Sequence, residues 1–234
     1  MQDESGVFIA SVRRPNLRVG LLGGSFNPAH DGHRHISLLA MQALALDEVW
    51  WLVSPQNPLK PEKGMASLAE RVSGARAIAR HPRIRVTDLE AQFETRYTID
   101  TLCALRRVFP GYRFVWLMGA DNLAQISRWR DWRAIFATVP IAVFSRPSYA
   151  FSAATGVASR HYGKACLPER FAKNLADRKP PAWVFLKTAQ SPVSATRLRG
   201  HGFGRGAGHG SGRGATFFRS GAGHPPGRSG GKPY

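Results

Sequence analysis

The chain of 234 residues lacks the patterns of several common protein classes. No apolar run approaches the roughly 20 residues that cross a bilayer, and the first residues, MQDES, are acidic where a signal peptide is basic. The two cysteines, Cys103 and Cys166, are too few for a disulfide framework and have no metal-ligand spacing. These absences predict a cytoplasmic protein with reduced thiols and no membrane segment.

Three catalytic signatures are also absent. The chain has no Gly-x-x-x-x-Gly-Lys-Ser/Thr phosphate loop, and its glycines at positions 20, 23 and 24 do not fit the Gly-x-Gly-x-x-Gly of dinucleotide dehydrogenases. Neither a Gly-x-Ser-x-Gly elbow nor a Cys/His constellation supplies a nucleophile. The sequence therefore argues against P-loop enzymes, dehydrogenases and covalent catalysis.

Acidic residues are few. The 15 Asp and Glu face 33 Lys and Arg, for a net charge of +18. Such an excess favours polyanionic partners, either nucleic acid or small phosphorylated substrates. Only five of the basic residues follow position 199, so most of the charge is spread over residues 1–199.

Composition divides the chain into three parts. Residues 1–16 have no clear periodicity and predict a flexible extension. Residues 17–199 have the patterning of a folded domain. Of the 24 glycines, 13 lie in residues 200–234, where they alternate with His, Phe, Arg and Ala. Such a low-complexity tail buries too little apolar surface to offset its ordering entropy, so we expect it to be disordered.

Strand-like and helix-like segments alternate along the middle part. Apolar runs predict strands over residues 17–22, 48–54, 84–87, 114–118, 141–145 and 183–187. Helical spacing, and a capping box at Ser67 and Glu70, predict helices over residues 32–46, 67–80, 97–109 and 168–178. This alternation indicates an α/β fold, a doubly wound, Rossmann-like parallel sheet with helices on both faces.

The most distinctive stretch follows the first predicted strand, where residues 23–33 read GGSFNPAHDGH. A glycine pair lets the backbone adopt conformations closed to other residues and approach a ligand closely. A helix that begins just after it offers N–H groups to an anion. Residues 54–60, 119–122, 145–146 and 191–199 also follow predicted strands. Because parallel strands end at one edge of the sheet, these segments predict a phosphate site there.

These residues resemble a known superfamily. Residues 23–33 are similar to the first signature of the HxGH nucleotidylyltransferases, Gly-Ser/Thr-Phe-Asp/Asn-Pro followed by His-x-Gly-His. Residues 194–199, SATRLR, resemble the second signature, Ile-Ser-Ser-Thr-x-Ile-Arg, with Val193 and Ala195 in place of its Ile and middle Ser. Residues 97–102, 119–121 and 129–132 resemble the bacterial nicotinate-nucleotide adenylyltransferases. The resemblance covers about residues 18–199.

The resemblance implies transfer of AMP from ATP to nicotinate mononucleotide, with Mg²⁺ accompanying ATP and deamido-NAD and pyrophosphate as products. It implies no metal site in the protein itself. The implied catalytic residues are His30, His33 and Arg199. The implied ATP-binding residues are Gly23, Gly24, Ser25, Phe26, His30, His33, Ser194, Thr196 and Arg199. The implied residues for nicotinate mononucleotide are Tyr97, Thr98, Gly119, Asp121, Trp129, Lys60 and Arg146.

Structural interpretations compete with several of these roles. Thr98 and Asp121 could cap helices, and Trp129 could belong to the core. Lys60 and Arg146 could be solvated surface residues, as lysine and arginine side chains usually are.

Two other functions stay open at this point. One is a different HxGH nucleotidylyltransferase, such as phosphopantetheine adenylyltransferase. The other is a nucleic-acid-binding protein that uses the basic tail, which ranks lower because residues 1–199 carry no RNA-binding signature. The sequence leaves homo-oligomerisation open. The family continues past the position of Arg199 with a short helix, which the glycine-rich tail replaces here through an altered reading frame or a lineage-specific extension.

Overall fold

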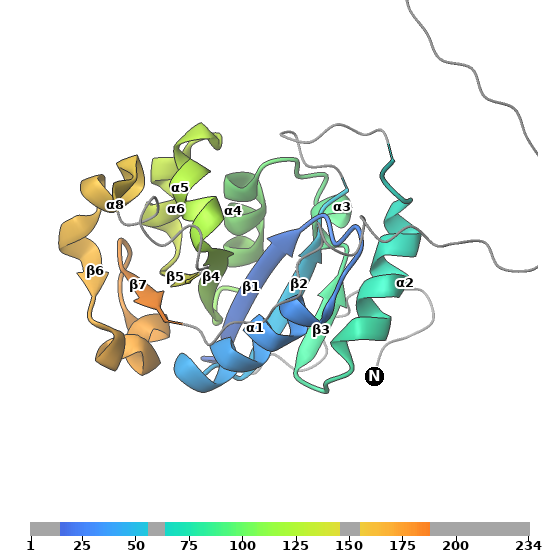
Figure 1. The fold of residues 1–234 in the computed structure, drawn as a ribbon, viewed down its shortest axis with the longest axis horizontal. Coiled ribbons are helices and arrows are strands. Elements are labelled where there is room, and N and C mark those ends of the chain that lie inside the picture. Colours follow the sequence, from blue (N-terminus) through green and yellow to red (C-terminus); the bar gives the residue numbers. More distant parts are fainter. Residues whose placement is uncertain (1–14, 56–63, 146–154, 188–234) are drawn as a thin grey trace, which may run out of the picture. The chain divides into compact units, whose positions relative to one another are not determined.

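The computed structural model describes residues 15–55, 64–145 and 155–187. Their strands form one seven-stranded sheet in the order β3-β2-β1-β4-β5-β7-β6, and every neighbouring pair is parallel (Figure 1). The strands are β1 (Arg18–Gly24), β2 (Glu48–Val53), β3 (Ile84–Thr87), β4 (Arg113–Gly119), β5 (Ile141–Phe144), β6 (Cys166–Leu167) and β7 (Trp183–Leu186). The predicted α/β fold with a parallel sheet is confirmed.

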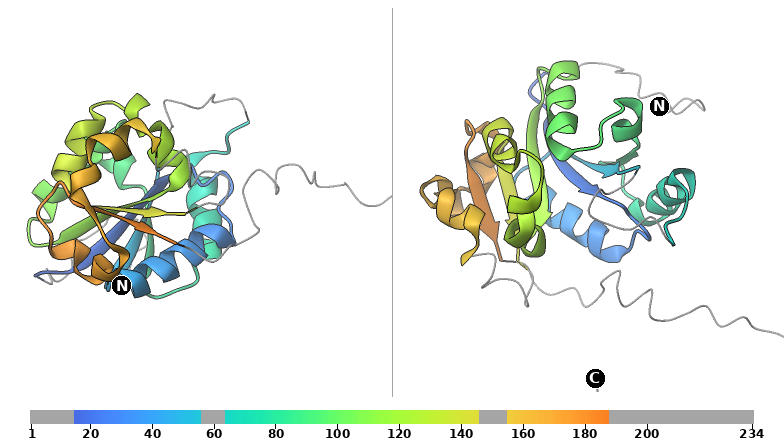
Figure 2. Two further views of the ribbon diagram at one scale, coloured as in Figure 1. Left: turned by 60° about the vertical axis from the view of Figure 1, so that its left-hand side comes forward. Right: turned by 90° about the horizontal axis from the view of Figure 1, so that it is seen from above.

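Helices cover both faces of this sheet (Figure 2). Residues of α3 (Leu89–Gln92), α4 (Thr98–Val108), α5 (Ala120–Gln125), α6 (Trp132–Thr138) and α8 (Val157–His161) pack into one hydrophobic cluster. Residues of α1 (Asp31–Ala43), α2 (Leu68–Ala79) and the 3₁₀ segment η3 (Glu169–Asp177) pack into the other. Two further 3₁₀ turns are η1 (Ile126–Arg128) and η2 (Gly163–Ala165).

The central strands are apolar because both of their faces are covered. In β4, Phe114, Trp116 and Met118 point into the first cluster, while Val115 and Leu117 point into the second. All six residues of β2 are buried. A strand buried on both faces reads as a continuous apolar run, which is why the sequence located these strands well.

Other elements differ from the predictions. β6, α6 and α8 were not predicted, and residues 169–177 form a 3₁₀ segment where an α-helix was expected. The N-cap of α6, Asp131, lies in the left-handed region (φ 47°) and makes no side-chain capping bond, and the helix is held by the packing of Trp132, Ile135 and Phe136. The capping box of α2 is confirmed, since Ser67 and Glu70 exchange side-chain and backbone hydrogen bonds.

The topology places β1 between β2 and β4 in the interior of the sheet. The chain leaves β1 toward β2 and β3, then crosses back to β4 on the other side, so the strand order reverses at β1. Open parallel sheets bind ligands beyond the carboxyl ends of the strands at such a reversal. The glycine loop, residues 23–30, lies at this point.

The amino ends of β1 and β4, opposite the glycine loop, are held by ion pairs. The Asp177 carboxylate of η3 accepts hydrogen bonds from Arg18 of β1 and Arg113 of β4. Asn16, next to β1, donates its N–H to the Gly111 carbonyl at 2.8 Å. Within the described ranges, no helix has the length and apolarity needed to span a membrane.

Candidate active site

The glycine loop begins with tight packing rather than with an unusual backbone. A Cβ at Gly23 would lie 2.5 Å from Cη2 of Trp116, whereas one at Gly24 would meet nothing closer than 3.5 Å. Neither glycine has a positive φ; among the described glycines only Gly64 does. The expectation that this pair adopts conformations closed to other residues is therefore wrong. The positive φ of the loop belongs to Phe26, at 45°.

Two histidines form the N-terminal cap of α1. Nδ1 of His30, the N-cap residue, accepts the Gly32 N–H at 3.1 Å, and Nδ1 of His33 accepts the His30 N–H at 3.2 Å. The ring centroids are 3.9 Å apart. Because Nδ1 of each ring acts as an acceptor, the neutral ring carries its proton on Nε2. Each histidine is thereby set as an Nε2–H donor at a helix N-terminus.

A buried aromatic stack of Phe26 and Trp51 packs against this cap. The Phe26 ring stacks on Trp51 with centroids 5.1 Å apart and also lies 4.8 Å from the ring of His33. The Trp51 indole N–H donates to Ser37 Oγ at 2.8 Å, and that hydroxyl donates to the His33 carbonyl at 2.8 Å. The sequence placed Trp51 in the core, and the structure adds that it is the floor of the histidine site.

Arg71 of α2 joins two loops at the carboxyl edge of the sheet. Its guanidinium donates to four carbonyl oxygens, namely those of Ser25 (2.8 Å), Ser54 (2.6 Å), Pro55 (2.8 Å) and Ala66 (2.9 Å). The residue is only 3% exposed, and burial lowers the pKa of its guanidinium, which nevertheless stays protonated at neutral pH. The sequence analysis did not single it out.

Ser54 and Glu90 lie beside this loop junction. The Ser54 N–H donates to the Gly24 carbonyl at 2.9 Å, which continues the pairing of β1 with β2. The Ser54 hydroxyl hydrogen-bonds the Glu90 carboxyl, which is 7% exposed. Burial raises the pKa of Glu90 to about 7, while the hydroxyl favours the ionised form. Sequence reasoning missed Glu90 as well.

The predicted acceptor-binding residues that the structure describes lie at the start of α4, at the end of β4 and around η1. Tyr97 is the N-cap of α4, and Thr98 is the first residue of that helix, so the alternative that Thr98 is the cap is wrong. The Arg130 guanidinium lies 4.6 Å from the centroid of the Tyr97 ring. This contact joins the start of α4 to Arg130, the residue that follows Trp129.

Trp129 and Asp121 are placed by short helices. Trp129 follows η1, and it is partly buried against the first hydrophobic cluster. Gly119 ends β4 and is the N-cap of α5, so Asp121 lies in the first turn of that helix and is not its cap. Tyr97 and Trp129 thus both pack against the first hydrophobic cluster, while Gly119 ends a strand of the sheet itself.

Five predicted site residues lie outside the described ranges: Lys60, Arg146, Ser194, Thr196 and Arg199. Their roles stay predictions. Among the described residues, no group of three or more His, Cys, Asp or Glu could hold a metal ion.

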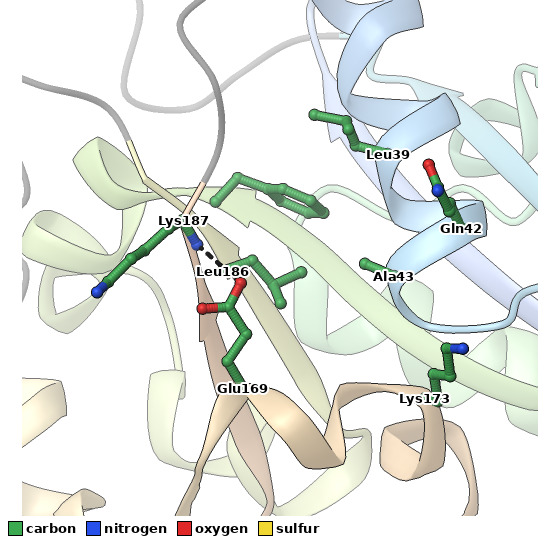
Figure 3. A pocket seen from close by; sticks show the side chains of 8 residues that line it. Leu39, Gln42, Ala43, Glu169, Lys173, Leu186 and Lys187 are labelled. Carbon is green, nitrogen blue, oxygen red and sulfur yellow. Dashed lines mark hydrogen bonds between the residues drawn. The ribbon is translucent and has the colours of Figure 1, made fainter.

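A separate cavity of about 330 Å³ lies between α1, η3 and the end of β7 (Figure 3). Leu39 and Ala43 contribute apolar surface from α1, while Glu169 and Lys173 come from η3. The Lys187 N–H donates to Glu169 Oε1 at 3.3 Å. None of the predicted site residues that the structure describes lines this cavity.

Comparison with known proteins gives consistent matches. The family model described as "Cytidylyltransferase-like" matches residues 21–201. The "Probable nicotinate-nucleotide adenylyltransferase" of Cereibacter sphaeroides strain ATCC 17023 is 52% identical over 188 residues, which cover 80% of this chain and 99% of the relative. The protein of the same name from Parvibaculum lavamentivorans strain DS-1 is also 52% identical over 188 residues, covering 80% and 94%.

A solved structure agrees on the fold. The Plasmodium falciparum nicotinic acid mononucleotide adenylyltransferase complexed with APC has a TM-score of 0.58 at 16% identity, covering 79% of this chain and 83% of that one. The sequence matches carry the assignment further than this fold likeness does. The chain belongs to the cytidylyltransferase-like family and, within it, to the nicotinate-nucleotide adenylyltransferases.

Proposed function

We propose that the chain transfers AMP from ATP to nicotinate mononucleotide in NAD biosynthesis. The observation that carries the proposal is the double-histidine cap of α1, which sets two Nε2–H donors beside a glycine loop. The membership of the chain in the nicotinate-nucleotide adenylyltransferases supports the choice of acceptor.

The reaction joins two phosphates. A phosphate oxygen of nicotinate mononucleotide attacks the α-phosphorus of ATP, and the bond from that phosphorus to the β-phosphate oxygen breaks. The products are deamido-NAD and pyrophosphate. The attacking oxygen is already an anion at neutral pH, so the site needs no general base. Catalysis then comes from positioning and from stabilising charge on the phosphates.

In this proposal the work is divided between an ATP side and an acceptor side. Backbone N–H groups near Ser25 and Phe26, with Nε2 of His30 and His33, donate to the ATP phosphates. Such preorganised donors are each worth roughly 3 kcal/mol in the transition state. Ser194, Thr196 and Arg199 are proposed to hold the β- and γ-phosphates, the arginine by forked contact.

The acceptor side is proposed to surround the pyridine ring. Trp129 stacks on the ring, and Thr98 with the N–H groups that begin α4 faces the carboxylate. Tyr97 and Gly119 line the same side, and Lys60 and Arg146 contact phosphate. Mg²⁺ enters with ATP and neutralises phosphate charge, and Asp121 is the described carboxylate proposed to contact that ion or a ribose.

The domain limits follow from the same proposal. Residues 17–199 form the catalytic domain, and residues 1–16 and 200–234 extend it. The family match ends at residue 201, which supports a boundary close to Gly200.

Turnover of purified full-length protein tests the proposal. ATP is supplied with nicotinate mononucleotide, nicotinamide mononucleotide or phosphopantetheine, and pyrophosphate release and the nucleotide product are measured. We expect the highest kcat/KM with nicotinate mononucleotide. Strong activity on phosphopantetheine with none on nicotinate mononucleotide would overturn the assignment.

A further inference from the structure

Arg71 is an uncommon kind of buried arginine. Among the described residues no carboxylate forms an ion pair with it within 4.0 Å. Its guanidinium instead donates hydrogen bonds to four carbonyl oxygens. Burying a charge is costly unless hydrogen bonds compensate it. The four hydrogen bonds compensate the buried charge of Arg71, and a neutral apolar side chain could not form them.

The four carbonyls come from three separate segments. Ser25 belongs to the glycine loop, Ser54 and Pro55 follow β2, and Ala66 precedes α2. A planar guanidinium has five N–H donors in a fixed fork, so one side chain can fix these segments relative to each other. A lysine ammonium has only three donors around one nitrogen and cannot reproduce that geometry.

The bond to Ser25 also decides where the next N–H points. In a trans peptide the C=O and the following N–H point in opposite directions, and the only cis bonds among the described residues are Asn27–Pro28 and Pro180–Pro181. Because the Ser25 carbonyl points at Arg71, the Phe26 N–H points away from it. In the described ranges, that N–H has no backbone acceptor.

The conformation of Phe26 makes this control necessary. Its φ of 45° is a left-handed conformation that costs a bulky residue about 1–2 kcal/mol, so the surroundings must hold it. The Trp51 stack holds the ring, and Arg71 holds the preceding peptide plane. The two contacts together determine the orientation of the Phe26 N–H.

We propose that Arg71 is a positioning residue that locks the Ser25–Phe26 peptide so that the Phe26 N–H donates to a phosphate of ATP. The inference rests on the proposed function only in taking the glycine loop as the ATP side of the site. Arg71 itself does not contact the nucleotide. No described carboxylate forms an ion pair with its guanidinium within 4.0 Å.

The first test compares Arg71→Met and Arg71→Lys with a matched control, Arg76→Met, at an exposed arginine of the same helix. Both Arg71 variants should raise KM for ATP about tenfold, as the loss of charge-assisted hydrogen bonds would, and change KM for nicotinate mononucleotide less than twofold. The control should match the wild type. A folded Arg71→Met with an unchanged KM for ATP, or full rescue by lysine, contradicts the proposal.

The second test needs no variant and stays informative if the Arg71 variants do not fold. In ¹⁵N-labelled wild-type protein, titration with ATP should shift the Phe26 amide proton downfield, and adenosine should not. No ATP-dependent shift of that amide overturns the proposal. If the shift occurs but no acceptor is adenylylated, the proposed function fails, whereas binding of ATP phosphate by the Phe26 N–H stands and the Arg71 variants decide the role of Arg71.

Discussion

The rings of His30 and His33 lie 3.9 Å apart, and the Nδ1 atom of each accepts a backbone N–H of the same helix start. The two histidines cap α1 in place of the usual Ser or Asp. In the proposed function they have a second role, because their Nε2–H groups would donate to the ATP phosphates. A substitution can separate the two roles.

His30→Asn and His30→Ala should differ in stability but not in catalysis. Asparagine is a good N-cap and can accept the Gly32 N–H, whereas alanine cannot, at a cost of about 1 kcal/mol. Both lose the Nε2–H donor, so both should lower kcat/KM on the order of 100-fold. Urea unfolding and steady-state kinetics measure the two effects. Wild-type turnover in His30→Asn would show that only the cap matters.

Gly23→Ala should destabilise the fold by about 1–3 kcal/mol, because its methyl group overlaps the buried Trp116 ring. Gly24→Ala is the matched control and should change stability by less than about 0.5 kcal/mol. Adding Trp116→Phe to Gly23→Ala removes the clashing ring atoms and should recover part of the loss. No hydrogen bond is lost with the indole, since Trp116 Nε1 has no partner among the described residues. A double-mutant cycle from thermal unfolding gives the coupling, and additive effects would refute the clash.

Glu90 should make stability depend on pH. Its pKa is about 7 in the folded protein and near the usual 4.5 when unfolded, so between these values only the folded state holds the proton. Stability therefore falls as pH rises from 4.5 to 7, by about 3 kcal/mol in all, and is then level. Glu90→Gln should remove this slope and be more stable than wild type at pH 8. Melting temperatures from pH 5 to 8.5 test this, with the exposed Glu94→Gln as control. Parallel curves for wild type and Glu90→Gln would refute it.

Trp129→Ala should raise KM for nicotinate mononucleotide by about tenfold or more, since stacking on an aromatic side chain is worth about 1–3 kcal/mol per base. The KM of Trp129→Phe for nicotinate mononucleotide should fall between those of Trp129→Ala and the wild type. KM for ATP serves as the internal control and should stay within twofold. A lowered melting temperature with an unchanged KM for nicotinate mononucleotide would make Trp129 a core residue only.

The fold was predictable where burial leaves a mark on the sequence. After Glu48, the fully buried strand β2 is an uninterrupted apolar run, and the Ser67–Glu70 box marks the start of α2. Helix α6 was not predicted, because it is only 7 residues long and is held by the packing of its apolar side chains rather than by a capping bond at Asp131. Long, strongly patterned elements carry local signals, and short elements that depend on tertiary packing do not.

The site divides in the same way. The glycine loop and both histidines are contiguous in sequence, so a motif identifies them. Arg71 and Glu90 act across the fold, through carbonyls and a hydroxyl from other segments, and nothing in their local sequence distinguishes them from ordinary helix residues. Even the need for glycine at position 23 comes from Trp116, a residue of another strand.

The position of β1 in the interior of the sheet has a consequence for biosynthesis. Among the described strands β1 is the first to leave the ribosome, but its neighbour β4 starts only at Arg113. For the whole of that interval one edge of an apolar strand has no partner, and an unpaired edge is a template for association with other chains. The chain is therefore most prone to aggregation while it is partly synthesised, before β4 is available to pair with β1. Slow translation before Arg113 should lower the yield of folded protein.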